Sequence, residues 1–116
     1  VQRLRTPVAA PATAPSAGEG CCRPLLEAQA CGVPVVATDF AAQPESVEFG
    51  RLVAGQPRWD PDRHVFMATV TPAAVADALD EQRAAGPSRW KDGRDFAVAR
   101  DHRAVFQRDW VSLLDR

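Results

Sequence analysis

Two glutamates, Glu19 and Glu27, stand eight positions apart in the stretch of this 116-residue chain whose residue types best suit ligand chemistry. Pro24 favours the first turn of a helix, which would place Glu27 in that turn and Glu19 in the loop just before it. A helix N-terminus presents free backbone N–H groups and the positive end of a dipole, and both attract anions. The arrangement therefore offers N–H groups to a diphosphate and carboxylates to hydroxyl groups, which sugars and ribose present beside a diphosphate.

The spacing alone does not separate such a site from a purely structural role. A carboxylate in a first helical turn commonly stabilises the helix dipole. Two acids eight residues apart also occur by chance in most proteins, so a motif of this kind needs a supporting structural context.

The residues after Pro24 predict that context, a helix followed directly by a strand. Leu25–Cys31 are acceptable helix residues, and Gly32 stands where a left-handed C-terminal cap is expected. Val33–Thr38 is a short apolar run rich in β-branched residues, which predicts a strand buried on both faces. This is half of a βαβ unit, so we expect an α/β fold with parallel strands and flanking helices. In such a sheet the start of the helix borders the crevice at the carboxyl ends of the strands, where ligands bind.

Two domain segments are expected. Residues 1–18 predict a weakly structured lead-in, in which Pro11 would restrict any strand over Val8–Ala14 to the edge of a sheet. Residues 19–116 predict one α/β domain.

The middle of the chain gives shorter signals. Asp39–Glu48 predicts a loop with one helical turn, and Arg51–Ala54 predicts a strand that Gly55–Pro57 would close. Arg58–Asp62 predicts an exposed loop, and Val65–Val70 predicts a further strand.

Two helices are expected in the last third. Thr71 and Pro72 suit the start of a helix that Gly86–Pro87 would end, and its buried face would hold Val75, Ala78, Leu79 and Gln82. Gly93–Leu114 predicts one long C-terminal helix. Its apolar stripe comprises Phe96, Ala99, Phe106, Trp110, Leu113 and Leu114.

Bulk properties exclude several classes of protein. The net charge is -1, from 14 basic and 15 acidic residues, which gives no electrostatic reason to expect nucleic acid or an anionic membrane as a partner. No stretch approaches the ~20 apolar residues that span a bilayer, and Val1–Ala14 lacks the apolar segment of a secretory signal. Three cysteines do not suggest a disulfide framework, so we expect a reducing, cytoplasmic setting.

The cysteines raise two rival hypotheses. Cys21, Cys22 and Cys31 with His64 or His102 would make a poor zinc site, because adjacent cysteines lack the usual spacing of two to four residues. We therefore expect no metal. A thiol at a helix N-terminus could act as a nucleophile, but no histidine–acid partnership is identifiable. Cys31 is expected on the inner face of the helix, His64 in a loop and His102 on a helix surface.

The residues around the two glutamates resemble a known family. Ala14–Gly20 and Pro24–Thr38 resemble the Glu-x(7)-Glu segment of the large retaining glycosyltransferase family of the GT-B fold, which includes glycogen-synthase-like and sucrose-synthase-like enzymes. The family pattern runs Pro-Ser, then Glu-Gly-Phe-Gly-x-Pro, then Glu-Ala-x-Ala-x-Gly-x-Pro-Val-Val-Ala. Three later stretches, Ala42–Glu45, Gly50–Val53 and Phe106–Leu114, also resemble the C-terminal region of that family.

This resemblance implies roles for individual residues. Glu27 would bind the ribose hydroxyls of a nucleotide-diphosphate sugar such as a UDP-, GDP- or ADP-sugar. Glu19 would contact the transferred sugar and hold it in a reactive pose, as the catalytic residue. The backbone N–H groups of Gly20, Cys21, Cys22 and Arg23 would cradle the sugar and the diphosphate. GT-B enzymes of this family retain the anomeric configuration and need neither an essential metal nor a cofactor.

The sequence departs from the family pattern within this segment. Cys21–Arg23 stands where Phe-Gly-x is expected, and a Cβ at Cys22 would crowd the donor where glycine allows close approach. Arg23 would either pair with phosphate or lie exposed, and both alternatives remain open.

The chain is also shorter than a GT-B enzyme, which closes a cleft between two Rossmann-like domains of more than ~300 residues in total. The resemblance therefore implies a partial, donor-binding C-terminal domain whose N-terminal acceptor domain lies upstream or on a partner chain. The alternative hypothesis is a non-catalytic remnant or interaction subunit that keeps the α/β scaffold. The acceptor, the nucleotide and the sugar stay open.

Overall fold

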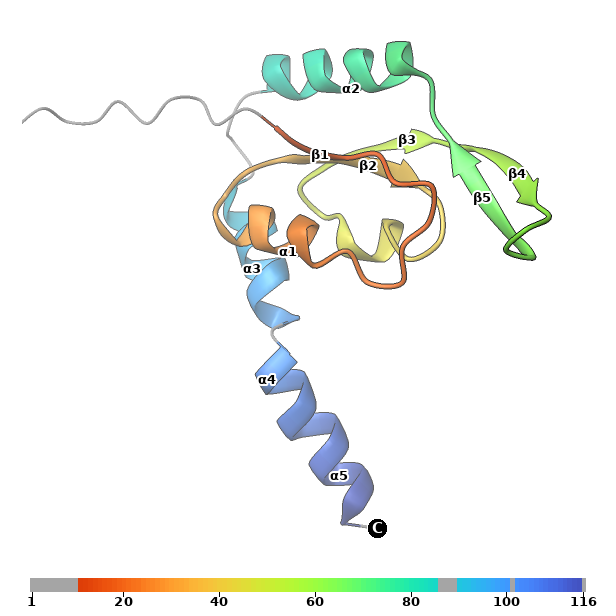
Figure 1. Cartoon of the computed structure of the whole chain (residues 1–116). Helices are drawn as coiled ribbons and strands as arrows, with labels where there is room; N and C mark the ends of the chain where they lie inside the picture. Colours follow the sequence, from red (N-terminus) through yellow and green to blue (C-terminus); the bar gives the residue numbers. More distant parts are fainter. Residues whose placement is uncertain (1–10, 86–89, 101, 116) are drawn as a thin grey trace, which may run out of the picture.

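The computed structural model describes residues 11–85, 90–100 and 102–115, and Figure 1 shows how the elements are arranged. Within these residues a three-stranded sheet and a two-stranded hairpin are formed, with helices on both faces of the sheet. The α/β class expected from the sequence is confirmed.

The three-stranded sheet is parallel, with the order β1-β2-β3. Its strands are β1 (Ala12–Ala14), β2 (Val35–Asp39) and β3 (Gly50–Ala54). The short β1 lies at the edge, as Pro11 required of a strand at this place. The central β2 is buried from Val35 to Thr38, because helices cover both faces of the sheet.

One face of the sheet is covered by α1 (Arg23–Ala30). Leu25 and Cys22 pack there against Val35 and Ala37. The helix ends as predicted: Gly32 has a φ of 75°, Gly32 N donates to Gln29 O at 2.9 Å, and Val33 N donates to Ala28 O at 2.9 Å. These two bonds form a Schellman motif, which only a left-handed residue allows, and the chain then turns directly into β2.

The opposite face is covered by α2 (Pro72–Ala85). Thr71 Oγ1 accepts a hydrogen bond from Ala74 N at 3.2 Å, so the predicted N-cap is confirmed. The helix packs Ala78 against Val36 and Val53, flanked by the partly buried Ala74, Val75 and Leu79. The predicted end at Gly86–Pro87 lies outside the described residues.

The segment between Gly55 and Thr71 corrects one prediction. β3 ends at Ala54, before Gly55, as predicted, but Gln56 and Pro57 already belong to a further strand, β4 (Gln56–Asp60). Arg58–Asp62 is not simply a loop, because β4 pairs antiparallel with β5 (Val65–Thr69). The hairpin extends away from the parallel sheet in Figure 1. Pro57 is tolerated because each strand of a two-stranded hairpin has a free edge, where no N–H is required.

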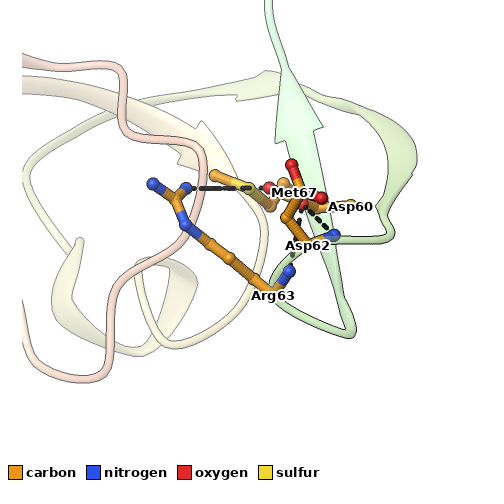
Figure 2. A network of polar contacts seen from close by, with 4 residues as sticks. All are labelled: Asp60, Asp62, Arg63 and Met67. Atoms are coloured by element: carbon orange, nitrogen blue, oxygen red, sulfur yellow. Dashed lines mark hydrogen bonds and ion pairs between the residues drawn. The ribbon is translucent and has the colours of Figure 1, made fainter.

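The turn of the hairpin is held by its own polar groups. Asp60 Oδ1 accepts hydrogen bonds from Asp62 N at 3.0 Å and Arg63 N at 3.2 Å (Figure 2). Arg63 Nη1 also lies 3.6 Å from Met67 Sδ, on the strand β5 that follows the turn. His64 lies in the predicted loop with a φ of 52°.

The long C-terminal helix is the second correction. The segment is divided into α3 (Trp90–Ala99), α4 (His102–Val105), the π-helical η2 (Phe106–Trp110) and α5 (Val111–Leu114). The π-helical turn shifts the side-chain register, so one stripe cannot continue along one face. The first part, α3, packs against α1, whereas Leu114 at the far end is 76% exposed.

Three local features complete the fold. The 3₁₀ helix η1 (Pro44–Ser46) is the single turn predicted within Asp39–Glu48. The helix α3 approaches the loop before β3 so closely that a Cβ on Gly93 would lie 2.4 Å from Phe49 Cβ, which explains the glycine. Cys31 is exposed rather than on the inner face of α1, because it lies two residues beyond the buried Gln29 and so about 200° around the helix.

Candidate functional site

The loop that carries Glu19 leaves the carboxyl edge of the parallel sheet. The register pairs Ala14 with Ala37 and Asp39 with Ala54, so the three strands end at the same edge. The loop Pro15–Cys22 leads from the end of β1 straight into α1. This is the position at which open α/β sheets bind ligands.

Three contacts fix the path of this loop. Ser16 Oγ accepts a hydrogen bond from Gly18 N at 3.3 Å, Ala17 O accepts one from Ala68 N of β5 at 2.8 Å, and Glu19 O accepts one from Ala42 N at 3.3 Å. The hairpin and the segment after β2 therefore hold the loop on two sides. Its outer surface is open, because a Cβ on Gly20 would meet no atom within 4 Å.

The fully buried Gln43 joins the ends of two strands beneath the loop. Its Oε1 accepts a hydrogen bond from Thr38 N at 2.7 Å, and its Nε2 donates to Ala14 O at 3.3 Å. The carboxyl ends of β1 and β2 are thereby locked together. Gln43 lies in the family-like stretch Ala42–Glu45, but its residue type and position did not predict this role.

A second buried amide, Gln29, sets the orientation of α1. Its Nε2 donates to Leu25 O at 2.9 Å and to Ser46 O, and its Oε1 accepts from Glu48 N at 2.9 Å and Phe49 N at 2.8 Å. Both donors and both acceptor positions of the amide are used. Gln29 was predicted only as a helix-forming residue. Its position four residues after Leu25, on the inner face of the helix, was the available signal of burial.

Cys22 is the N-cap of α1, and its side chain is buried among Leu25, Val35 and Ala37. Burial raises the pKa of the Cys22 thiol, a backbone hydrogen bond at Leu25 opposes the rise, and the nearby Glu19 carboxylate adds to it. A thiol held neutral is a poor nucleophile. The sulfur lies in the core rather than at the surface, and the crowding of a donor by the Cβ of Cys22 stays a prediction.

The backbone N–H groups before α1 differ in their availability. Arg23 N donates to Cys21 O at 3.1 Å and Leu25 N donates to Cys22 O at 3.1 Å, so these two groups are engaged. No acceptor among the described residues takes a hydrogen bond from the N–H of Gly20, Cys21 or Cys22. The donors expected from the sequence are thus reduced from four residues to three.

Glu27 lies one residue further into the helix than predicted, which places it just beyond the first turn. The helix begins at Arg23, so its first turn holds no acid, and the Glu27 side chain is 68% exposed with Oε1 3.9 Å from Arg23 Nη2. Glu27 lines a groove of about 270 Å³ between α1 and α3. Glu19 is not among the residues that line this groove, and its position is tied to the loop instead.

Four residues of α1 and three from the end of α3 and the turn that follows it form the groove. The first set is Arg23, Leu26, Glu27 and Ala30, and the second is Ala97, Val98 and Arg100. The contribution of the second set was not predicted from the sequence.

The cysteines do not gather at one place. Cys21 is exposed in the loop, Cys22 is buried and Cys31 is exposed at the other end of α1. Across the described residues, no group of three or more His, Cys, Asp or Glu side chains has the geometry to hold a metal ion. Nor does any helix in the described ranges combine the length and apolar character needed to cross a bilayer.

Comparison with known proteins was made against families, curated proteins and solved structures. The family model described as glycosyl transferases group 1 matches residues 8–82. The match covers more than half of the chain and includes Glu19, Glu27 and both buried glutamines. No curated protein and no solved structure matches the chain.

Proposed function

The chain belongs to the glycosyl transferases group 1 family, and from that premise we propose that it binds the nucleotide-diphosphate sugar donor of a retaining, GT-B-type glycosyltransferase. The observation that carries the proposal is the loop Pro15–Cys22, which is fixed at the carboxyl edge of the sheet and leads directly into α1. The family match favours glycosyl transfer over the alternative of a non-catalytic remnant.

Each candidate residue has a role in this proposal. Glu27 accepts hydrogen bonds from the ribose hydroxyls, and Glu19 contacts the transferred sugar. The N–H groups of Gly20, Cys21 and Cys22 face the diphosphate, whose charge is favoured beside the positive end of α1. Arg23 contributes through its side chain, since its N–H is engaged by Cys21 O.

The acceptor is expected to bind outside this domain. We propose that an acceptor-binding domain, upstream or on a partner chain, closes over the donor and completes the cleft. The described residues then supply only part of the donor contacts, so we expect this chain alone to bind nucleotide weakly, with a dissociation constant of about 1 mM. Micromolar binding by this chain alone would contradict that division of the site.

Titration of the whole chain with UDP, GDP and ADP, followed by ¹H–¹⁵N NMR, tests the role of Glu27. Loss of a charged acceptor should weaken binding of the preferred nucleotide by about 10- to 150-fold in Glu27→Ala. Asp77→Ala, which removes an exposed acid from α2 on the other face of the sheet, is the matched control and should bind like the wild type. Equal dissociation constants for Glu27→Ala and the wild type would remove Glu27 from the site.

A further inference from the structure

The groove between α1 and α3 brings two arginines together with Glu27. Arg23 comes from the first residue of α1, and Arg100 follows the last residue of α3. These three charged side chains give the lining a net positive charge. Its volume of about 270 Å³ falls just below the roughly 300–1,000 Å³ of small-molecule sites, so the groove suits part of a nucleotide sugar rather than the whole molecule.

Arg100 is held in place before any ligand binds. Its Cζ lies 4.0 Å from the centroid of the Phe96 ring, and its backbone N donates to Ala97 O at 3.2 Å in the turn that ends α3. A guanidinium stacked on a ring keeps its N–H edges available for hydrogen bonds. No carboxylate of the described residues lies within ion-pair distance of it. Arg100 is therefore an ordered cation that an anion can join at little conformational cost.

Arg23 occupies a position that helix stability does not explain. A cation in the first turn opposes the helix dipole. Its pair with Glu27 is long, at 3.9 Å between Nη2 and Oε1, and both side chains are more than two-thirds exposed. Such a pair contributes little to stability. An anionic ligand at this end of α1 can therefore take Arg23 from Glu27 and leave the carboxylate for hydroxyl groups.

We propose that Arg100 and Arg23 bind the diphosphate of the nucleotide donor across this groove, while Glu27 binds the ribose of the same ligand. This inference rests on the proposed function and adds α3 to the donor site. Planar guanidinium groups match phosphate oxygens with paired N–H donors. The groove then holds the ribose–diphosphate part of the donor, and the base and the sugar extend beyond its ends.

The test uses the whole chain and three probes: the nucleoside diphosphate that binds most tightly among UDP, GDP and ADP, its parent nucleoside, and inorganic pyrophosphate. In Arg100→Gln we expect binding of the diphosphate and of pyrophosphate to weaken about 10-fold, with nucleoside binding unchanged. Arg83→Gln, an exposed arginine on α2 across the sheet, is the charge-matched control and should leave all three unchanged. Arg100→Lys keeps the charge but loses the paired donors, so its affinity for the diphosphate and for pyrophosphate should lie between those of the wild type and Arg100→Gln.

The outcomes separate the two proposals. If Arg100→Gln binds the diphosphate as tightly as Arg83→Gln does, the role of Arg100 is overturned while Glu27-dependent binding stands. If Arg100→Gln weakens binding of the nucleoside and of the diphosphate equally, the role of Arg100 is also overturned, because the substitution then disturbs the groove as a whole. If the wild type shows no response to any nucleoside diphosphate at ~10 mM, the inference and the proposed function both fail for this chain.

Discussion

The α1–β2 unit and the β4–β5 hairpin lie on either side of the same loop, yet they are held together in opposite ways. The α1–β2 unit is held by two buried amides, Gln29 within α1 and Gln43 just after β2. Both bond to backbone groups of other segments of the chain. The hairpin relies on a cross-strand aromatic pair that stays in contact with water: Trp59 is 47% exposed and Phe66 62% exposed. The candidate site therefore rests on a rigid base and is flanked by an element with little core of its own.

The largest expected effect concerns the buried amide of α1. Gln29→Leu keeps the approximate size of the side chain but removes the buried hydrogen bonds to Phe49 N and Ser46 O. Buried groups left unpaired cost 1–3 kcal/mol each, so we expect a loss of about 3 kcal/mol or more in the free energy of unfolding, measured with urea. Gln107→Leu, on an exposed helical turn, is the control and should change stability by less than ~0.5 kcal/mol. A loss for Gln29→Leu as small as the control would mean that the amide does not hold α1 in place.

A smaller effect of opposite sign is expected within β2. Thr38 is buried, and its hydroxyl has no hydrogen-bond partner in the described part of the chain. Thr38→Val removes that unpaired group without changing the shape of the side chain, so the protein should gain about 1 kcal/mol in stability. Thr13→Val, at an exposed position of the edge strand β1, is the control and should change the free energy of unfolding little. Destabilisation by Thr38→Val would show that the hydroxyl has a partner after all.

The smallest change in global stability is expected in the hairpin. The ring centroids of Trp59 and Phe66 lie 5.1 Å apart in an edge-to-face arrangement, and such exposed cross-strand pairs contribute roughly 0.2–1 kcal/mol. Trp59→Ala should therefore lower the free energy of unfolding by less than ~1 kcal/mol, while amide hydrogen exchange in β5 becomes faster. A double-mutant cycle with Phe66→Ala isolates the pair. A loss above ~2 kcal/mol would place the hairpin in the cooperative core.

The same two regions show what the sequence can predict. The start of α1, its end at Gly32 and the buried β2 follow from local signals, namely a proline, a left-handed glycine and a run of β-branched residues. Strand β4 gives no such signal, because Arg58–Asp62 is mostly polar, follows Pro57 and contains Pro61, and β4 becomes a strand only by pairing with β5. Cross-strand pairing of this kind overrides the intrinsic preference of single residues.

The candidate site was likewise predicted only in part from the sequence. The glutamates could be singled out from residue types and spacing, although Glu27 lies beyond the predicted first turn because α1 begins at Arg23. The roles of Gln29 and Gln43 depend on partners 17 to 29 residues away, which no local pattern indicates. The approach of Arg100 to Glu27 was equally hidden, since the predicted single C-terminal helix gave no reason to place the end of α3 against α1.

The most direct test of the account is a map of the amide shifts that the preferred nucleoside diphosphate produces in this chain. Binding at the carboxyl edge of the sheet predicts that the largest shifts fall on Gly20, Cys21, Cys22 and the first two turns of α1, with α2 unaffected. Shifts concentrated on the hairpin or on α2, with none in the loop before α1, would contradict it.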